Sequence, residues 1–383
     1  MEAQSSQLAE AIPAVSTSPR VLIDGRKLGD GGIGVYISNL VEGLVALGGA
    51  HITVLAYQDR RSALPCQESV EWIFDSARSY SLDEYLFLPR RIDFSRYDIF
   101  HAPHYSVPRR IPIPTVVTIH DLIHIKHPER FFYPYVARPL IRGAVSKASA
   151  VIAVSRDTRE QIIREIGAPA AKVRYIPNAV PSFLSATLAQ NSDKAQNEYL
   201  LAVLSNTKPH KGIEDLLRAY RIFVERQKRM RRTQSPVALK LVGFGAAQLQ
   251  RESRFAALLS DTPGVEVVGA VDSEILRGLY SGASALVVPS VAEGFCLPAL
   301  EAQSVGTPVV CRPVAALEEL LTEQDVVADD FSVGALERAL HEVVARGVPE
   351  RRCIPQHLAR FSQREVAGQT LEVYRQVISQ GVA

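Results

Sequence analysis

The stretch EGFCLPALE, residues 293–301, sets two glutamates eight positions apart with a proline between them. The apolar run SALVVPS precedes it, so we expect a strand, then a loop that carries Glu293, then a helix. Pro298 suits the first helical position, because its missing N–H would be unpaired there in any residue. This places Glu301 in the first helical turn, so the two carboxylates do not share one helix face.

The loop between the two glutamates has the features of an anion site. The backbone N–H groups of Phe295, Cys296 and Leu297 would point beyond the strand, and Gly294 lets the backbone approach closely. Carboxylates accept hydrogen bonds from sugar hydroxyls, and a helix N-terminus attracts phosphate. The stretch therefore suits a ligand with phosphate and several hydroxyls. The alternative is structural, with the later glutamate only favouring the helix dipole.

A second glycine-rich segment, GDGGIG at residues 29–34, matches the dinucleotide-binding pattern, and Asp59 follows the next predicted strand. In that pattern the first glycine follows the strand almost directly, whereas Gly29 is the fifth residue after the strand predicted at 21–24. Two further interpretations stay open. The segment is either a flexible loop before a helix, or a loop whose backbone N–H groups accept an anion without binding a dinucleotide.

The segment SNTKPHKGIEDLL, residues 205–217, leaves one predicted strand and enters an amphipathic helix near Gly212. Lys211 then lies just before a helix N-terminus, where its ammonium group and free backbone donors could converge on one phosphate. A solvated loop lysine is the alternative.

Histidines gather between residues 101 and 127. His120 and His124 would share a face in a helix and suggest a metal site, but TVVTIH predicts a strand that ends at His120. We therefore expect no metal there, and no Asp-x-Asp pair follows a predicted strand either. His120 remains the candidate site residue, because a ligand cleft forms at the carboxyl ends of parallel strands.

Alternating apolar runs and amphipathic segments position these residues. The first half predicts strands at 21–24, 51–57, 97–102, 115–120 and 148–155, and helices at 34–47, 138–148 and 156–167. A polar segment at 181–198 is typical of a linker, after which strands at 199–205, 237–243, 265–271, 284–290 and 307–312 restart the alternation. We expect an α/β protein of two doubly wound, Rossmann-like domains facing a central cleft. The domains would span 19–180 and 199–363, after a disordered tail at 1–18.

Composition excludes other classes. The 383 residues are 47% hydrophobic and 22% charged, and the net charge of +2 is too small for a typical nucleic-acid binder. The four cysteines are widely spaced, which argues against a zinc ribbon or a disulfide framework and indicates a reducing, cytoplasmic setting. The sequence shows neither a run long enough to span a bilayer nor the order of a signal peptide.

Together these motifs resemble the retaining glycosyltransferases of the GT-B fold, in the large family-four group. EGFCLPALE is similar to the E-G-F-G-L-P-x-x-E motif of that family, and KPHKG and GTPVV fall in the family's order. In the first half, GGIGVY, HAPHYSVP and TVVTIHDLIHIKHPERF resemble the bacterial mannosyltransferase-like branch that builds surface polysaccharides. The resemblance runs from about residue 20 to 380 and implies a closing helix, near 364–383, that crosses back onto the first domain.

The resemblance also implies roles for single residues. Glu301 would hold the donor ribose, Glu293 and His120 would lie by the transferred sugar, and Lys211 would hold the diphosphate together with the N–H groups of residues 295–297. The remaining donor-site residues would be Gly31 and Gly32 near the phosphates and Val271 and Asp272 near the base. The implied substrates are a nucleotide diphosphate sugar, with GDP-mannose as the best guess, and a saccharide hydroxyl, with neither a cofactor nor a metal required.

Two positions depart from the family pattern. Cys296 replaces a glycine, which is tolerable only if the position does not need φ > 0. Asn206 stands where many members carry an arginine that clamps the phosphates, so either Lys208 assists or the donor is held less tightly. Because of these departures, a non-catalytic nucleotide-sugar-binding protein remains an alternative. The GDGGIG segment leaves a nicotinamide-dependent oxidoreductase as a second alternative.

The acceptor side has a charge surplus. Residues 20–180 contain 21 Lys and Arg against 16 Asp and Glu. This is either a solvated surface or a face that rests on the anionic inner surface of the cytoplasmic membrane, as a lipid-linked saccharide acceptor would require.

Overall fold

The computed structural model describes residues 18–185, 199–230, 237–243, 253–347 and 354–381. The tail predicted at 1–18 lies outside these ranges except for Ser18. The linker predicted at 181–198 lies outside them from residue 186 on.

The first half of the chain forms a seven-stranded parallel sheet in the order β3-β2-β1-β4-β5-β6-β7. The three strands β4, β5 and β6 are buried along their whole length, as expected where helices cover both faces of a parallel sheet. The strands are β1 Arg20–Asp24, β2 His51–Ala56, β3 Glu71–Phe74, β4 Ile99–Ala102, β5 Thr115–Ile119, β6 Ala150–Ala153 and β7 Val173–Tyr175.

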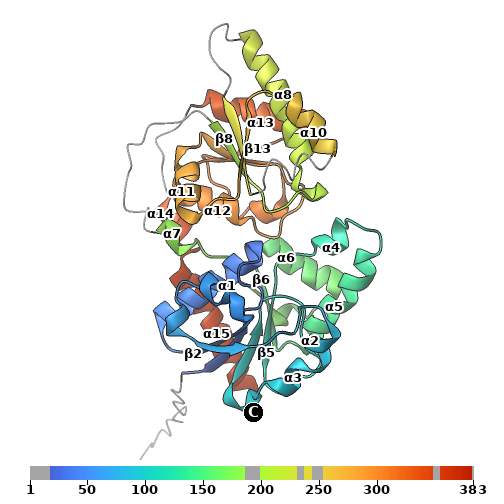
Figure 1. Cartoon of the computed structure of the whole chain (residues 1–383), viewed down its shortest axis with the longest axis vertical. Helices are drawn as coiled ribbons and strands as arrows, with labels where there is room; N and C mark the ends of the chain where they lie inside the picture. Colours follow the sequence, from blue (N-terminus) through green and yellow to red (C-terminus); the bar gives the residue numbers. More distant parts are fainter. Residues whose placement is uncertain (1–17, 186–198, 231–236, 244–252, 348–353, 382–383) are drawn as a thin grey trace, which may run out of the picture.

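The second half forms a six-stranded parallel sheet in the order β10-β9-β8-β11-β12-β13. Its strands are β8 Tyr199–Val203, β9 Ala238–Val242, β10 Val265–Gly269, β11 Ala285–Val288, β12 Val309–Cys311 and β13 Val326–Val327. The strand order reverses beside β1 in the first sheet and beside β8 in the second. Figure 1 shows the two sheets in separate domains, one above the other, so the predicted doubly wound pair is confirmed.

Helices cover both sheets. In the first domain they are α1 Gly31–Leu47, α2 Leu82–Leu86, α3 Leu88–Arg91, α4 Ile123–Lys126, α5 Tyr133–Lys147 and α6 Arg156–Gln161, with α7 Ser182–Ser185 at the junction. In the second they are α8 Ile213–Met230, α10 Ser253–Ser260, α11 Ser273–Gly282, α12 Leu297–Ser304, α13 Val333–Ala345 and α14 Pro355–Ala359. Helix α5 begins five residues before the predicted start, because Pro134 fits the first helical turn.

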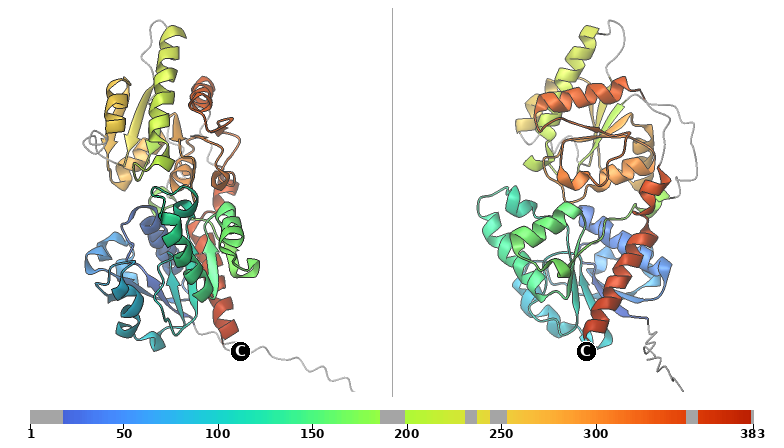
Figure 2. Two further views of the ribbon diagram at one scale, coloured as in Figure 1. Left: turned by 90° about the vertical axis from the view of Figure 1, so that its right-hand side faces the viewer. Right: turned by 180° about the vertical axis from the view of Figure 1, so that it is seen from behind.

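The C-terminal helix α15, Gln363–Gly381, returns to the first domain and packs along α1, as predicted (Figure 2). Gly43 permits this approach, because a Cβ there would lie 2.8 Å from both the Ala367 Cβ and the Gln363 carbonyl oxygen. Tyr374 of α15 also shares a 2.6 Å hydrogen bond with Nδ1 of buried His101 on β4. Nε2 of His101 is 2.8 Å from the Thr118 hydroxyl.

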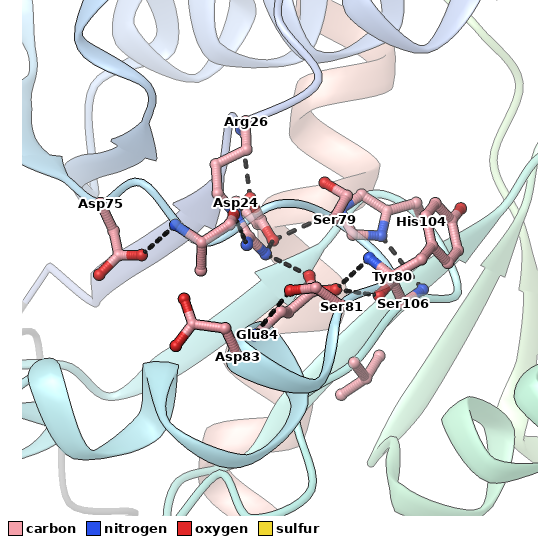
Figure 3. Close-up of polar contacts among 12 residues, drawn as sticks. Asp24, Arg26, Asp75, Ser79, Tyr80, Ser81, Asp83, Glu84, His104 and Ser106 are labelled. Atoms are coloured by element: carbon pink, nitrogen blue, oxygen red, sulfur yellow. Dashed lines mark hydrogen bonds and ion pairs between the residues drawn. The ribbon is translucent and has the colours of Figure 1, made fainter.

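A buried charge cluster fixes the loop after β1 (Figure 3). The guanidinium of Arg26 contacts the carboxylates of Asp24 and Glu84, each at 2.5 Å, and all three residues are buried. The second oxygen of Glu84 accepts hydrogen bonds from the Ser106 hydroxyl and from the backbone N–H of Tyr80. Tyr80 needs this support because its φ is +66°, an unfavourable value for a bulky residue.

Candidate active site

A cleft of about 790 Å³ lies between the two domains. Its walls are the loops at the carboxyl ends of the strands, where doubly wound sheets bind ligands. The structure brings together twelve of the fourteen predicted site residues in its lining: Gly31, Gly32, His120, Asn206, Lys208, Lys211, Glu293, Gly294, Phe295, Cys296, Leu297 and Glu301.

Lys211 and Glu293 form an ion pair at the centre of the cleft wall. The ammonium nitrogen is 2.8 and 2.9 Å from the two carboxylate oxygens, and the Ser290 hydroxyl donates a 2.6 Å hydrogen bond to the same carboxylate. Burial by itself would lower the pKa of Lys211, but the charge and hydrogen bond of Glu293 outweigh it and raise the pKa. The lysine is therefore held as a cation, aimed at any anion in the cleft.

Glu301 occupies a different environment. It is the fifth residue of α12, so the prediction that it lies in the first turn is wrong by about one turn, because the helix begins at Leu297. Its carboxylate is buried and accepts a 2.6 Å hydrogen bond from the Tyr280 hydroxyl. Burial raises the pKa of Glu301, and the bond from Tyr280 partly opposes that rise.

Cys296 adopts a left-handed backbone conformation. From the sequence we expected a cysteine to be tolerable here only if the position did not need φ > 0. Its φ is +78° and its ψ is +72° at the N-cap position of α12. A glycine would adopt these angles without cost, whereas a side chain with a Cβ costs about 1–2 kcal/mol there. The position therefore does need φ > 0, and the cysteine is held in place by burial of its side chain.

Gly294 lies at a close approach between the two domains. A Cβ at this position would lie 2.0 Å from the carbonyl oxygen of His120 and 2.9 Å from the Cβ of Asp121. The Thr158 hydroxyl lies within 3.4 Å of both the His120 and the Gly294 carbonyl oxygens. The close approach that this glycine allows is thus to the opposite domain.

His120 presents a defined ring to the cleft. Its Nε2 lies 2.9 Å from the Pro103 carbonyl oxygen, which only accepts hydrogen bonds, so Nε2 carries the proton. Burial lowers the pKa of His120, although the Pro103 carbonyl and Asp121 oppose that change. The ring is therefore neutral at pH 7, with Nδ1 as a hydrogen-bond acceptor, and Tyr36 packs edge-on against it.

The glycines of the loop at residues 29–34 have two different roles. Gly29 has φ +77°, and a Cβ on Gly34 would lie 2.7 Å from the Gly29 nitrogen, so both serve the turn itself. Gly31 and Gly32 begin α1 and line the cleft, and a Cβ on either would meet no heavy atom within 4 Å among the described residues. Asp59 has a largely exposed side chain and is not in the cleft lining.

Four predicted residues have specific local partners. Lys208 forms a 2.7 Å ion pair with Glu129 of the first domain, so its charge is already engaged. The Asn206 side chain accepts a hydrogen bond from the Lys208 backbone N–H. Asp272 caps α11 through the Ile275 N–H, and Val271 packs against the core. Neither Val271 nor Asp272 is part of the cleft lining, although Ser273 is.

The sequence did not single out several residues that shape the cleft. Ser290 and Tyr280 hold the two glutamates, and Asn178 and His124 line the wall. A serine three residues before Glu293 was a usable signal, whereas Tyr280 is brought to Glu301 only by the packing of α11 on α12. Among the described residues, no group of three or more His, Cys, Asp and Glu side chains is arranged to hold a metal ion.

The chain has two doubly wound domains and a C-terminal helix that returns to the first domain, and the loop at residues 293–297 lines the cleft between the domains. These features are those of a GT-B glycosyltransferase. Two family models match the chain, "Glycosyltransferase Family 4" over residues 30–182 and "Glycosyl transferases group 1" over residues 185–357. The chain belongs to the family-four glycosyltransferases of the GT-B fold.

Relatives agree with this assignment. The chain is 29% identical over 301 residues to O-antigen chain mannosyltransferase B of Escherichia coli, covering 74% of this chain and 75% of the relative. It is 25% identical to O-antigen chain mannosyltransferase RfbU of Salmonella typhimurium, covering 63% and 64% of the two chains. The fold also matches Anabaena Alr3699/HepE, solved with UDP and glucose, with TM-score 0.67, 18% identity, and coverage of 94% and 100%.

Proposed function

We propose that this glycosyltransferase moves a hexosyl group, with mannosyl from GDP-mannose as the best candidate, to a saccharide hydroxyl with retained anomeric configuration. The product would belong to a bacterial surface polysaccharide such as an O-antigen chain. The naming of the two O-antigen mannosyltransferase relatives supports the sugar and the setting. The UDP complex of the structural relative supports a nucleotide diphosphate sugar as the donor class.

The observation that carries the proposal is the Lys211–Glu293 pair in the cleft wall. A buried cation without its partner is costly, so Lys211 is paired before a donor arrives, and it keeps Glu293 while its ammonium group also contacts the diphosphate. Negative charge then grows on the leaving diphosphate, and a preorganised cation and N–H groups at residues 295–297 stabilise it. Such electrostatic stabilisation usually contributes more to catalysis than any other single effect.

The same pair favours front-face attack over double displacement. Both oxygens of Glu293 are within 2.9 Å of the Lys211 ammonium, and one also accepts from Ser290. A carboxylate so engaged is a weak nucleophile. In the proposed mechanism the leaving phosphate takes the proton of the acceptor hydroxyl, while Glu293 and the Nδ1 acceptor of His120 orient the transferred sugar.

Other donor contacts follow from the cleft lining. Glu301 would accept hydrogen bonds from the ribose, and Gly31 and Gly32 would approach the phosphates from the first domain. Val271 and Asp272, beside the lining residue Ser273, would lie near the base. We propose that the reaction needs neither a cofactor nor a metal ion, since Lys211 and the helix N-termini supply the positive charge at the phosphates.

Thermal scanning with GDP, UDP, ADP and NAD tests the donor class, because a ligand that binds only the folded state raises the melting temperature. We expect GDP to stabilise the chain, and Lys211→Ala and Glu301→Ala to remove that stabilisation. A parallel assay with GDP-mannose and an oligosaccharide acceptor tests turnover. Stabilisation by NAD alone would instead support the oxidoreductase, and binding without turnover would support a non-catalytic sugar-nucleotide binder.

A further inference from the structure

Helix α5 carries apolar side chains on the face that it exposes to solvent. Its opposite face, Ala137, Ile141, Ala144 and Val145, packs into the first domain. A helix on a globular protein normally presents polar residues outward. The exposed residues Tyr135, Val136 and Leu140 of α5, with Phe131 and Phe132 just before the helix, form what we call the α5 face.

The exposure on this face is large. Phe131 is 86% exposed, Tyr135 78% and Val136 55%. Single exposed apolar residues are common on proteins, but a contiguous group of large ones marks an interaction surface. A second group lies on α2 and just after it, with Leu82, Tyr85, Leu86 and Phe87 exposed. The Lys147 ammonium lies 4.8 Å from the Tyr85 ring centroid and thereby joins α5 to α2.

The charge around the α5 face is positive. Residues 126–147 contain five basic residues, Lys126, Arg130, Arg138, Arg142 and Lys147, and one acidic residue, Glu129. Glu129 is already paired with Lys208. Aromatic side chains flanked by Lys and Arg are typical of surfaces that lie in the interface of an anionic bilayer. Figures 1 and 2 place α4, α5 and α2 on one side of the first domain.

The α5 face is continuous with the cleft. His124 lines the cleft, and Tyr133 packs edge-on against it with ring centroids 5.7 Å apart. Phe132 packs on Tyr133 at 5.1 Å, and Phe131 packs on Phe132 at 5.8 Å. A row of aromatic rings therefore leads from the cleft wall to the most exposed residue of the surface.

We propose that the α5 face docks onto an anionic lipid bilayer and so brings the head of a lipid-linked saccharide acceptor to the cleft. The link to an acceptor rests on the proposed function, whereas bilayer binding rests on this surface alone. The two can therefore fail separately. Within the described part of the chain, no helix combines the length and apolar character that a membrane crossing requires.

Flotation of the full chain with vesicles tests the docking. We expect binding to vesicles of phosphatidylglycerol and phosphatidylethanolamine, weak binding to phosphatidylcholine, and a loss of binding in high salt. The double variant Phe131→Ser, Tyr135→Ser should bind anionic vesicles at least roughly tenfold more weakly, and so should Arg130→Gln, Arg142→Gln. Phe331→Ser is the matched control, since Phe331 is an exposed aromatic residue of the other domain.

The possible results separate the proposal from its rivals. All four altered residues are accessible, so thermal melting should confirm that the variants stay folded. Wild-type binding that neither double variant weakens, or no binding by the wild type, would overturn the proposal. A wild-type dimer that Phe131→Ser, Tyr135→Ser converts to a monomer, without vesicle binding, would show that a second copy covers this face. Donor-induced stabilisation, measured alongside, reports on the proposed function independently.

Discussion

At the scale of single residues, the cleft contains one favourable ion pair and one residue in an unfavourable backbone conformation. The Lys211–Glu293 pair holds a cation where a diphosphate would bind. Cys296, three residues later, adopts backbone angles that glycine adopts more easily. Residues in unfavourable conformations persist only where their surroundings hold them, and they are concentrated at functional sites.

The conformation of Cys296 predicts that substitution by glycine destabilises the protein less than substitution by alanine. Cys296→Gly and Cys296→Ala both remove the buried sulfur, but only the alanine keeps a Cβ at φ +78°. We expect the glycine variant to be more stable than the alanine variant by about 1 kcal/mol. Urea unfolding of both proteins measures this, and an alanine variant of equal or greater stability would contradict it.

The Lys211–Glu293 pair predicts a strong energetic coupling. Lys211→Met alone strands a carboxylate in a largely buried site, whereas Lys211→Met with Glu293→Gln does not. A double-mutant cycle in urea should give a coupling free energy of about 2 kcal/mol. The exposed pair Arg218–Glu214 is the control, and its coupling should not exceed about 0.5 kcal/mol. Equal coupling in both pairs would argue against a special role for the cleft pair.

At the scale of elements, buried polar side chains hold the first domain's loops and helices in register. Arg26, Asp24 and Glu84 tie the end of β1 to α2 (Figure 3). His101 ties β4 to β5 through Thr118 and to α15 through Tyr374. Each tie consists of groups that are costly to bury unless all of them are paired.

The Arg26 cluster predicts a large cost for removing its cation. Arg26→Met leaves two buried carboxylates without a counter-charge, so we expect a loss of about 3–5 kcal/mol of unfolding free energy. Glu84→Gln should cost much less, because Arg26 keeps Asp24 as a partner. Adding Asp24→Asn and Glu84→Gln to Arg26→Met should restore part of the loss. Urea unfolding measures the unfolding free energy of the two single variants and of the triple variant. An Arg26→Met variant that loses little stability would rule out this role for the cation.

His101 predicts acid sensitivity. Burial, with smaller effects from His120 and His104, lowers the pKa of His101 to about 3. The unfolded chain takes up this proton near pH 6.5, so stability is full above that pH and falls as pH decreases toward 3. Between pH 6.5 and 4.5 the wild type should lose about 2 kcal/mol more than His101→Gln. Substitution of His51, whose side chain is exposed, serves as the control.

At the scale of the whole molecule, two domains enclose the site, and one of the contacts between them requires a glycine, Gly294. The Gly294 loop of the second domain lies against the His120 carbonyl of the first, and Lys208 and Glu129 form an ion pair across the same gap. The residues of the proposed catalytic centre come from both sides, so activity should depend on how closely the domains approach.

Gly294→Ala tests this dependence. Its Cβ would lie 2.0 Å from the His120 carbonyl oxygen, so the domains must separate locally. We expect transfer activity to fall at least roughly tenfold, since small misplacements of reacting groups carry costs of this order. The melting temperature should change little. Gly278→Ala in α11, where a Cβ meets no heavy atom within 4 Å among the described residues, is the control. Full activity of Gly294→Ala would show that this contact is not needed.

The sequence by itself determined the class of fold and twelve of the residues that line the cleft. Apolar runs that alternate with amphipathic segments require parallel sheets between helices, and the carboxyl ends of such strands meet at one edge. Residues that follow strands, such as His120, Lys211 and Glu293, could therefore be assigned to a cleft before any coordinates. The strands β3, β7 and β13 were missed because they are short, partly exposed strands at sheet edges and lack the continuous apolar run of a buried strand.

Only the tertiary structure decided contacts between segments far apart in the chain. Tyr280 reaches Glu301 through helix packing, Gly294 meets the His120 carbonyl across the domain gap, and Phe131 stays exposed beside a helix whose other face is buried. Periodicity states which residues share a face of one element, but not what lies opposite that face. The left-handed conformation of Cys296 likewise could not be predicted from the sequence, because such a conformation at a non-glycine residue is imposed by the packing around it.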